Sequence, residues 1–294
     1  MSGTLYIVAT PIGNLSDMSE RAIETLKSVD LIAAEDTRNT AKLLSRFDIH
    51  TPMGANHKFN EKAALDKFTG ALLSGQSIAV VSDAGTPCIN DPGYVLAAEC
   101  AKLGIDIVGV PGPCAAATVV SVSGLPSDTF CFMGFFPREK KQREEVLEYI
   151  KGNRTELYVF YESPNRIIDA LEYLSKDFGE DRIALCNDLT KLHERIYRGT
   201  VREVLSELSA NPNADKGEYA FALYHEASAA ESQDEDKGPS LEAMLTDIIV
   251  KRSCTVKDAV SLLATDASAN PTGKIPASKK EIYQASLNLK GLFE

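Results

Sequence analysis

The chain has 294 residues, of which 44% are hydrophobic and 25% charged, with a formal net charge of −11. This composition is typical of a globular protein with room for two domains, and the acidic balance argues against a protein that coats nucleic acid non-specifically while leaving room for a local basic surface. The apolar runs are shorter than the ~18 residues of a membrane helix, and the N-terminus lacks a signal peptide's basic region and cleavage site, so we expect a cytoplasmic protein.

In the first 113 residues, apolar runs alternate with amphipathic ones. The runs at 4–10, 29–36, 76–83 and 105–112 are nearly all apolar, which predicts parallel strands covered on both faces, with helices between them. We therefore predict an α/β domain with a parallel sheet over residues 1–113. Ligands of such sheets bind beyond the carboxyl ends of the strands.

Three loops rich in proline and glycine follow the first, third and fourth of these strands, at 10–14, 82–93 and 110–117. The first holds a single glycine, Gly13, where a dinucleotide-binding loop has three, so a ligand with a pyrophosphate is not indicated. Any one of the loops could be a simple turn. Three at one edge of a sheet instead predict a shared binding site, for which S-adenosylmethionine is one candidate because it has no pyrophosphate.

Residues 114–226 combine apolar strand-like runs with charged helical ones, which predicts a second α/β domain with mixed strand directions. An acidic, polar linker is expected at 227–240, followed by three short amphipathic helices in a helical C-terminal region at 241–294. From Lys251 onward seven basic residues outnumber four acidic ones. A solvated helix face and a nucleic-acid contact explain this surplus equally well.

The cysteines are scattered, without a C-x-x-C pair or a histidine at metal-ligand spacing. We interpret them as buried free thiols and expect no metal site. They are Cys88, Cys100, Cys114, Cys131, Cys186 and Cys254.

The blocks ATPIGNL (9–15), AEDTR (34–38), SDAGTPCINDPG (82–93), FYESPNR (160–166) and DLTK (188–191) follow one another in a recognisable order. In this the chain resembles the tetrapyrrole-methylase superfamily, and within it the ribosomal RNA methyltransferase branch, up to about Ala227. The resemblance implies a homodimer of chains with two α/β domains, which hold S-adenosylmethionine in the cleft between them. It also implies the substrate, the ribose 2′-OH of a decoding-centre cytidine in 16S ribosomal RNA, presented as free RNA or in the small ribosomal subunit.

The same resemblance implies which residues bind the cofactor. They are Pro11, Ile12, Asp83, Gly85, Thr86, Pro87, Pro113, Cys114, Ala115, Ala116, Tyr161, Glu162, Leu189 and Ala220. Two positions depart from the branch: Asn165 stands where relatives have histidine, and Glu194 is followed by Arg195 instead of a second glutamate. No catalytic role is carried over to those two positions.

Methyl transfer to a hydroxyl needs alignment and a proton acceptor. The catalytic candidates are Glu35, Asp36, Arg38, Glu61 and Lys191, with a carboxylate or Lys191 assisting the proton and Arg38 holding an RNA phosphate. The alternative interpretation of AEDTR is a helix N-terminus capped by Thr37.

Basic side chains near aromatic ones are the candidates for RNA binding, although charged runs are more often solvated faces. They are His57, Lys58, Asn60, Arg138, Lys140, Lys141, Arg143, Lys279 and Lys280. Phe59, Phe135 and Phe136 are candidates for stacking on bases, and Phe135 is expected in the core. Two other functions share this fold: methylation of a small tetrapyrrole, and RNA binding without catalysis in ribosome assembly.

Overall fold

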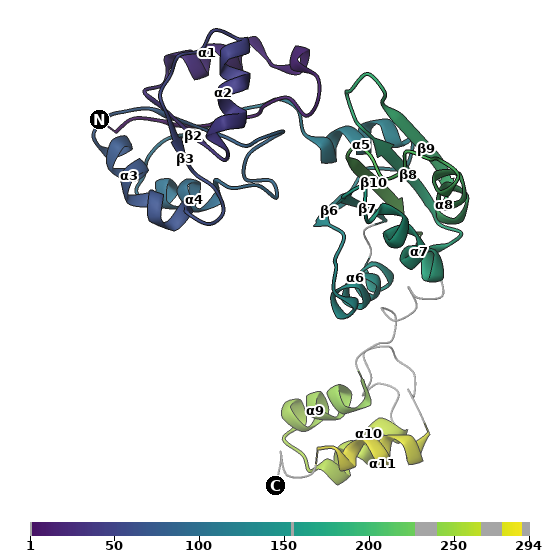
Figure 1. The fold of residues 1–294 in the computed structure, drawn as a ribbon. Helices are drawn as coiled ribbons and strands as arrows, with labels where there is room; N and C mark the ends of the chain where they lie inside the picture. The colour runs from purple at the N-terminus through teal and green to yellow at the C-terminus, as the bar shows by residue number, and fades with distance from the viewer. Residues whose placement is uncertain (1, 154–155, 227–239, 266–277, 290–294) are drawn as a thin grey trace. The chain divides into compact units, whose positions relative to one another are not determined.

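The computed structural model describes residues 2–153, 156–226, 240–265 and 278–289 (Figure 1). The chain forms two compact units, Met1–Glu226 and Ala227–Glu294. The finer boundaries expected at residues 113 and 240 stay predictions. Within the described ranges, none of the helices has the length and apolar character needed to cross a membrane.

The first sheet of the larger unit has five parallel strands in the order β3-β2-β4-β1-β5, as the alternation of apolar runs predicts. The strands are β1 (Leu5–Val8), β2 (Leu31–Ala34), β3 (Met53–Ala55), β4 (Ile78–Val81) and β5 (Ile107–Val110). Only β3 was missed by the sequence analysis. It is an edge strand of three residues with Gly54 at its centre, too short and too weakly apolar to form a recognisable run.

Helices cover both faces of this sheet. Side chains of α1 (Glu20–Ser28) and α2 (Thr37–Arg46) pack on one face, where Leu26 and Leu44 join the core. Those of α3 (Glu61–Leu73) and α4 (Tyr94–Lys102) pack on the other, around the fully buried Phe68 and Leu72. Burial on both faces is the reason why the strands are apolar throughout.

The second sheet of the larger unit is mixed, in the order β6-β7-β10-β8-β9. Strand β6 pairs with β7 in parallel and the other pairs are antiparallel, which confirms the mixed directions expected from the sequence. The strands are β6 (Phe130–Phe135), β7 (Leu157–Glu162), β8 (Arg182–Asn187), β9 (Arg195–Thr200) and β10 (Tyr219–Tyr224). One face packs against α6 (Lys140–Gly152), α7 (Ile167–Phe178) and α8 (Val201–Ser209), and the other against α5 (Ala115–Ser123).

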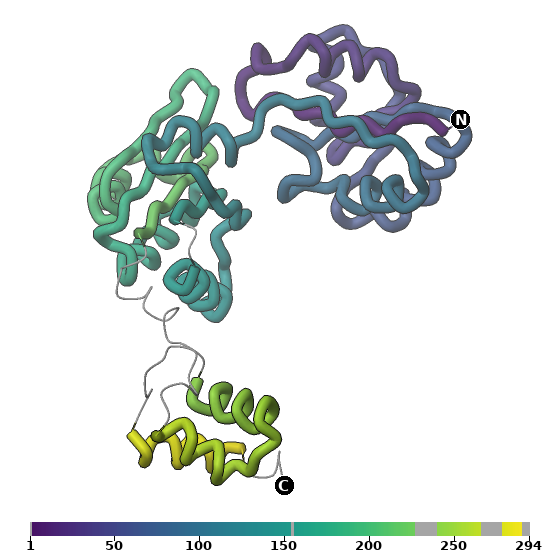
Figure 2. The backbone as a smooth tube through the Cα atoms, turned by 180° about the vertical axis from the view of Figure 1, so that it is seen from behind, coloured from purple at the N-terminus to yellow at the C-terminus, as the bar shows by residue number. Residues whose placement is uncertain are grey.

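The described residues of the smaller unit form three helices, which lie side by side in Figure 2. They are α9 (Leu241–Arg252), α10 (Val256–Thr265) and α11 (Lys279–Leu287), and each matches a predicted amphipathic helix. Leu245, Leu263 and Ile282 are fully buried between them, in a cluster that contains residues of this unit alone. The smaller unit therefore has a hydrophobic core of its own.

Candidate functional site

A cavity of about 590 Å³ lies where the carboxyl edge of the first sheet meets the second sheet, within the larger unit. Its volume is within the ~300–1,000 Å³ usual for small-molecule sites. The walls come from the loops after β1, β2, β4 and β5 on one side and from β7, β10 and the loop after β8 on the other. A cavity therefore lies beyond the strand ends, where the three loops predicted a shared binding site.

Two glycines let the loops approach one another. Backbone hydrogen bonds join Thr10 and Gly85 in both directions, at 2.8 and 3.0 Å, and Gly85 has a φ of +81° that favours glycine. At Gly13 a Cβ atom would lie 2.6 Å from Cγ of Lys191 and 3.1 Å from the carbonyl oxygen of Leu189. The single glycine of the first loop therefore permits close packing against residues 188–191 instead of cradling a phosphate.

The AEDTR block forms an acidic turn at the start of α2. Asp36, and not the expected Thr37, caps the helix, because its Oδ1 accepts the backbone N–H of Arg38 at 2.8 Å. The hydrogen bonds and charge of Arg38 hold the pKa of Asp36 well below its usual range. Asp83 supports the turn, with Oδ1 accepting from the backbone N of Asp36 at 3.2 Å and Oδ2 from Nδ2 of Asn39 at 3.0 Å.

Hydrogen bonds also fix the start of α5 against the cavity. The Thr86 hydroxyl donates to the carbonyl oxygen of Pro113 at 3.0 Å, and the backbone N of Ala116 donates to the Tyr161 hydroxyl oxygen at 3.0 Å. Burial raises the pKa of Tyr161 to about 12. The phenol therefore stays protonated at neutral pH.

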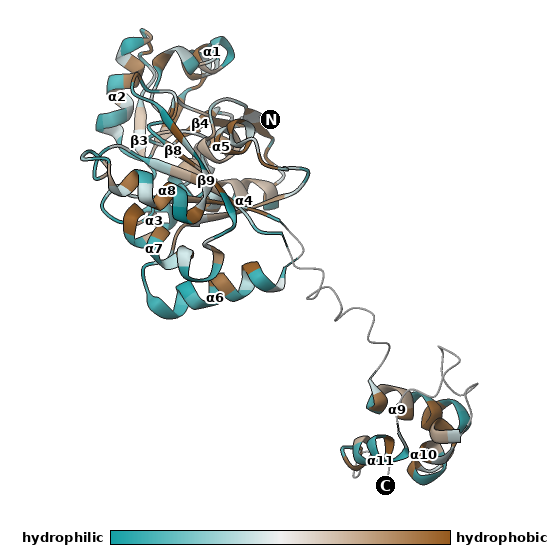
Figure 3. Cartoon of the chain, turned by 90° about the vertical axis from the view of Figure 1, so that its right-hand side faces the viewer, coloured by the Kyte–Doolittle hydropathy of each residue, from teal (hydrophilic) through white to brown (hydrophobic). Residues whose placement is uncertain are grey.

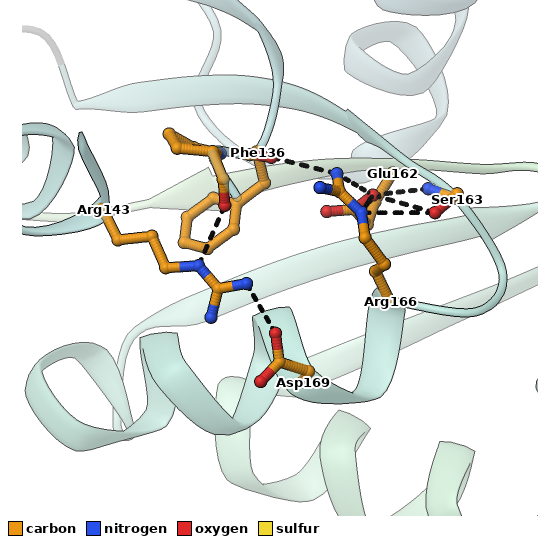
Figure 4. Close-up of polar contacts among 7 residues, drawn as sticks. Phe136, Arg143, Glu162, Ser163, Arg166 and Asp169 are labelled. Atoms are coloured by element: carbon orange, nitrogen blue, oxygen red, sulfur yellow. Dashed lines mark hydrogen bonds and ion pairs between the residues drawn. The ribbon is translucent and has the colours of Figure 1, made fainter. Parts of the chain in front are cut away.

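Figure 4 shows the buried ion pair between Arg166 and Glu162, a residue that lines the cavity. Oε1 of Glu162 accepts from the backbone N of Ser163 at 2.6 Å and from Nε of Arg166 at 2.8 Å, while Nη2 of Arg166 also donates to the carbonyl oxygen of Phe136 at 3.0 Å. Oε2 of Glu162 is buried and accepts no hydrogen bond from any residue of the described ranges. A buried acceptor without a protein partner is suited to a ligand that supplies a hydrogen-bond donor.

The lining of the cavity is acidic. It includes the carboxylates of Glu35, Asp83, Asp91, Glu162 and Glu218, and none of the described lining residues is lysine, arginine or histidine. Such a cavity favours a cation. S-adenosylmethionine, the cofactor implied by the resemblance, fits this set of carboxylates because both its sulfonium and its amino group are positive.

Most of the predicted cofactor residues line the cavity. Those in the lining are Ile12, Asp83, Gly85, Thr86, Cys114, Ala115, Tyr161, Glu162, Leu189 and Ala220. Pro11, Pro87, Pro113 and Ala116 are next to lining residues in the chain but are not part of the wall. The wall also contains residues that were not predicted, among them Asn90, Asp91 and Phe135. The first two belong to the same proline- and glycine-rich loop as Asp83, which was the available signal.

Of the catalytic candidates, Glu35 alone lines the cavity, and burial raises its pKa. Oε1 of Glu61 accepts from the backbone N of Gly93 at 2.6 Å, which ties α3 to the end of the 82–93 loop. Nζ of Lys191 lies 2.7 Å from Asp188 and 2.8 Å from Glu218. Burial opposes the charged form of Lys191, but the two carboxylates outweigh it and raise the pKa, which makes this amine a poor proton acceptor.

The backbone near the cavity carries unusual conformations. Among the described non-glycine residues with positive φ are Cys88 and Asn90 in the 82–93 loop, and Asp188 and Thr190 after β8. Thr190, at +67°, is β-branched, which makes this conformation costly. Strained residues of this kind cluster at functional sites.

The RNA-binding candidates are dispersed and lie outside the cavity wall. Asn60 closes its own loop, accepting from the backbone N of His57 at 2.7 Å and donating to the carbonyl oxygen of Ala55 at 3.0 Å. Lys58 is exposed between them. Lys279 and Lys280 are exposed at the start of α11.

The candidates around α6 differ in orientation. Figure 3 shows the helix as largely hydrophilic, and Lys140 and Lys141 are exposed, 3.6 and 3.9 Å from glutamates one turn later. Arg138 lines a second hollow of about 480 Å³. Arg143 points inward, pairs with Asp169 at 2.5 Å and has a side chain only 11% exposed (Figure 4), so its guanidinium is already engaged.

Phe135 was expected in the core and Phe136 was a candidate for stacking on bases, but the structure has them the other way round. Phe135 is 53% exposed and lines the cavity, whereas Phe136 is 1% exposed in the core, so the expected burial of Phe135 was wrong. The reason is a register shift between Phe132 and Phe135 at the edge of the sheet, where Gly134 has a φ of +73°.

The chain matches known proteins over most of its length. Residues 4–205 match the family model described as Tetrapyrrole (Corrin/Porphyrin) Methylases. The chain is 43% identical to "Ribosomal RNA small subunit methyltransferase I" of Escherichia coli O157:H7, over 89% of this chain and 90% of that protein. It is 40% identical to the protein of the same name from Bacillus subtilis (strain 168), over 96% and 94%.

Solved structures share the fold. A diphthine synthase superposes with a TM-score of 0.60 at 10% identity, over 79% of this chain and 94% of its own. The methyltransferase CobJ superposes with a TM-score of 0.55 at 18% identity, over 76% and 95%. With the family match and the identities above, these similarities place the chain in the tetrapyrrole methylase family and, within it, in the group of ribosomal RNA small subunit methyltransferase I enzymes.

Proposed function

We propose that this chain transfers the methyl group of S-adenosylmethionine to the ribose 2′-oxygen of a decoding-centre cytidine in 16S ribosomal RNA. The observation that carries the proposal is an acidic cavity between two sheets, in a chain 43% identical to a named ribosomal RNA methyltransferase. The donor supplies an electrophilic methyl carbon on a positively charged sulfur.

The residues of the chain would hold both reactants in line. Carboxylates of the wall attract the positive donor, the unpartnered Oε2 of Glu162 accepts one of its N–H or O–H groups, and Phe135 at the wall excludes water. The same negative charge repels RNA phosphates. The ribose therefore has to enter the cavity while the RNA phosphates stay at the rim of the cavity.

Basic groups outside the cavity are the proposed phosphate contacts. Arg38, at the start of α2, is nearest in the chain to the acidic wall. Its Nε and Nη2 pair with Asp36, but the side chain is 87% exposed, which leaves Nη1 for a phosphate. Arg138, Lys140 and Lys141 form a second group. Lys58, with the neighbouring Phe59 side chain 94% exposed, offers charge and stacking together. Since Arg143 is engaged internally, it is left out of the proposed RNA surface.

Two further proposals concern the protein's state in the cell. We propose a homodimer, supported by the exposed aromatic side chains of the β6 region, where Phe130 is 45% exposed. We propose the cytoplasm as its location, because small ribosomal subunits are found there.

The decisive experiment gives the purified protein methyl-labelled S-adenosylmethionine together with small ribosomal subunits that lack the modification, or with free 16S RNA. We expect label in a single nuclease fragment and, after digestion, 2′-O-methylcytidine by mass spectrometry. Label on a base would contradict the ribose target. Cofactor binding without any transfer to RNA would favour a non-catalytic assembly protein or a small-molecule methylase.

A further inference from the structure

The loop at residues 82–93 holds Asp91 in a fixed position on the cavity wall. Its start is bonded to Thr10 through Gly85, and its end is held by Glu61 through the backbone N of Gly93. Between these points the backbone N of Cys88 donates to the carbonyl oxygen of Pro92 at 3.3 Å. Asp91 is half-buried in a loop that is tied at both ends.

The other carboxylates of the wall are engaged. Oε2 of Glu35 accepts from the backbone N of Asp83 at 3.2 Å, and both oxygens of Asp83 accept hydrogen bonds from the α2 turn. Glu162 pairs with Arg166, and Glu218 with Lys191.

Asp91 is different. Its carboxylate accepts no hydrogen bond and forms no ion pair with any residue in the described ranges. A half-buried carboxylate without a protein partner costs free energy of folding. Each of the other four acids has at least one oxygen bound within the protein, whereas both oxygens of Asp91 have no partner among the described residues and are free to meet a ligand.

The surroundings of Asp91 make it more basic than an ordinary aspartate. Burial, followed by the negative charges of Glu35 and Asp83, raises the pKa of Asp91 to about 6. Two neutral groups complete its surroundings: the Cys88 thiol, whose pKa burial raises to about 11, and the Tyr161 phenol. At neutral pH Asp91 is ionised, yet its basicity is near the optimum for taking up a proton.

We propose that Asp91 is the catalytic residue that accepts the proton of the acceptor hydroxyl, an assignment that rests on the proposed function. The hydroxyl proton passes to a carboxylate oxygen of Asp91 as the 2′-oxygen forms a bond to the methyl carbon. The bond from that carbon to sulfur breaks, and its electron pair stays on sulfur. The donor thereby loses its positive charge, and the hydroxyl proton neutralises the carboxylate of Asp91 until it passes to water.

The test is the isosteric variant Asp91→Asn, compared with the wild type in cofactor binding and in single-turnover methylation of small subunits. We expect calorimetry to show an affinity for S-adenosylmethionine within about 2-fold of wild type, which also verifies folding, and a methylation rate at least ~100-fold lower. The wild-type rate should rise with pH around a midpoint near 6, and the variant should lack this rise.

Asp106→Asn is the matched control. Asp106 is an exposed aspartate immediately before β5, at the amino end of the sheet and away from the cavity, so both properties should stay unchanged. Asp91→Asn with the wild-type rate and pH profile would overturn the assignment, and loss of cofactor binding would make Asp91 a cofactor anchor instead. A wild type that methylates no ribose would overturn the proposed function as well, which distinguishes the two failures.

Discussion

Gly85 and Gly70 should respond to alanine in opposite directions. At Gly85, φ is +81°, and alanine in this left-handed region costs about 1–2 kcal/mol. Gly70 is exposed inside α3, and beyond its neighbours and its own helix backbone nothing lies within 4 Å of an added Cβ, so alanine in such a helix gains about 0.5–1 kcal/mol. Urea unfolding should therefore show Gly85→Ala less stable and Gly70→Ala more stable than wild type.

The two substitutions control for each other, since each adds one methyl group. Gly85→Ala should also weaken S-adenosylmethionine binding, because the Thr10–Gly85 pairing positions two cavity loops, whereas Gly70→Ala should not. Equal stability of Gly85→Ala and wild type would mean that this loop is not held at its positive φ.

At the level of single residues, the sequence predicts which residues line the cavity better than it predicts what each of them does there. Asp83 was among the predicted cofactor residues, but its hydrogen bonds to the α2 turn join residues more than forty positions apart in the chain. The exchange of Phe135 and Phe136 depends on a local register shift, which no periodicity shows. Asp91 was not predicted, because what sets it apart is that no described residue of the folded protein forms a hydrogen bond or an ion pair with its carboxylate.

The helices α9, α10 and α11 offer a prediction at the level of elements. Since their core contains no residue of the larger unit, deleting residues 241–294 should leave that unit folded and binding S-adenosylmethionine normally. Small subunits should be methylated poorly, and RNA affinity should fall less steeply with salt, because each lost phosphate contact removes about 0.7 from the logarithmic slope. Filter binding over a salt series measures this.

A full-length control is Lys279→Ala/Lys280→Ala, which keeps the helices but removes two exposed charges from α11. We expect its salt slope to fall between those of the wild type and the truncation. If the truncated protein methylates subunits at the full rate with an unchanged slope, the helices have no part in RNA binding. Lys140 and Lys141 would then be the leading contacts, testable by the corresponding double alanine variant.

Elements were predictable where their apolar runs were long. All strands except β3 and β9 coincide with apolar or aromatic stretches. The helix α5 follows a run of small residues, and the helices of the smaller unit follow amphipathic runs. Three residues at a sheet edge leave no periodic signal, and strand order depends on contacts between distant segments.

At the level of the whole molecule, the proposed homodimer predicts sedimentation at twice the chain mass of 31.9 kDa at micromolar concentration. Exposed apolar side chains such as Phe130, Tyr94 and Leu192, at 45, 70 and 92% exposure, are costly in a monomer, and a stable dimer usually buries at least ~1,200 Å². Sedimentation equilibrium at several concentrations is the measurement. A mass that stays at 31.9 kDa throughout would exclude the dimer.

The position of β1 between β4 and β5 has a consequence for how the chain folds during synthesis. This strand leaves the ribosome before its partners β4 and β5, with which Leu5 pairs through Ile78 and Ile107. At translation rates of about 5–20 residues per second, β1 waits on the order of 5–20 s for its last neighbour. An apolar strand exposed for that long invites wrong pairing, and a chaperone that covers β1 would protect the sheet until β5 emerges.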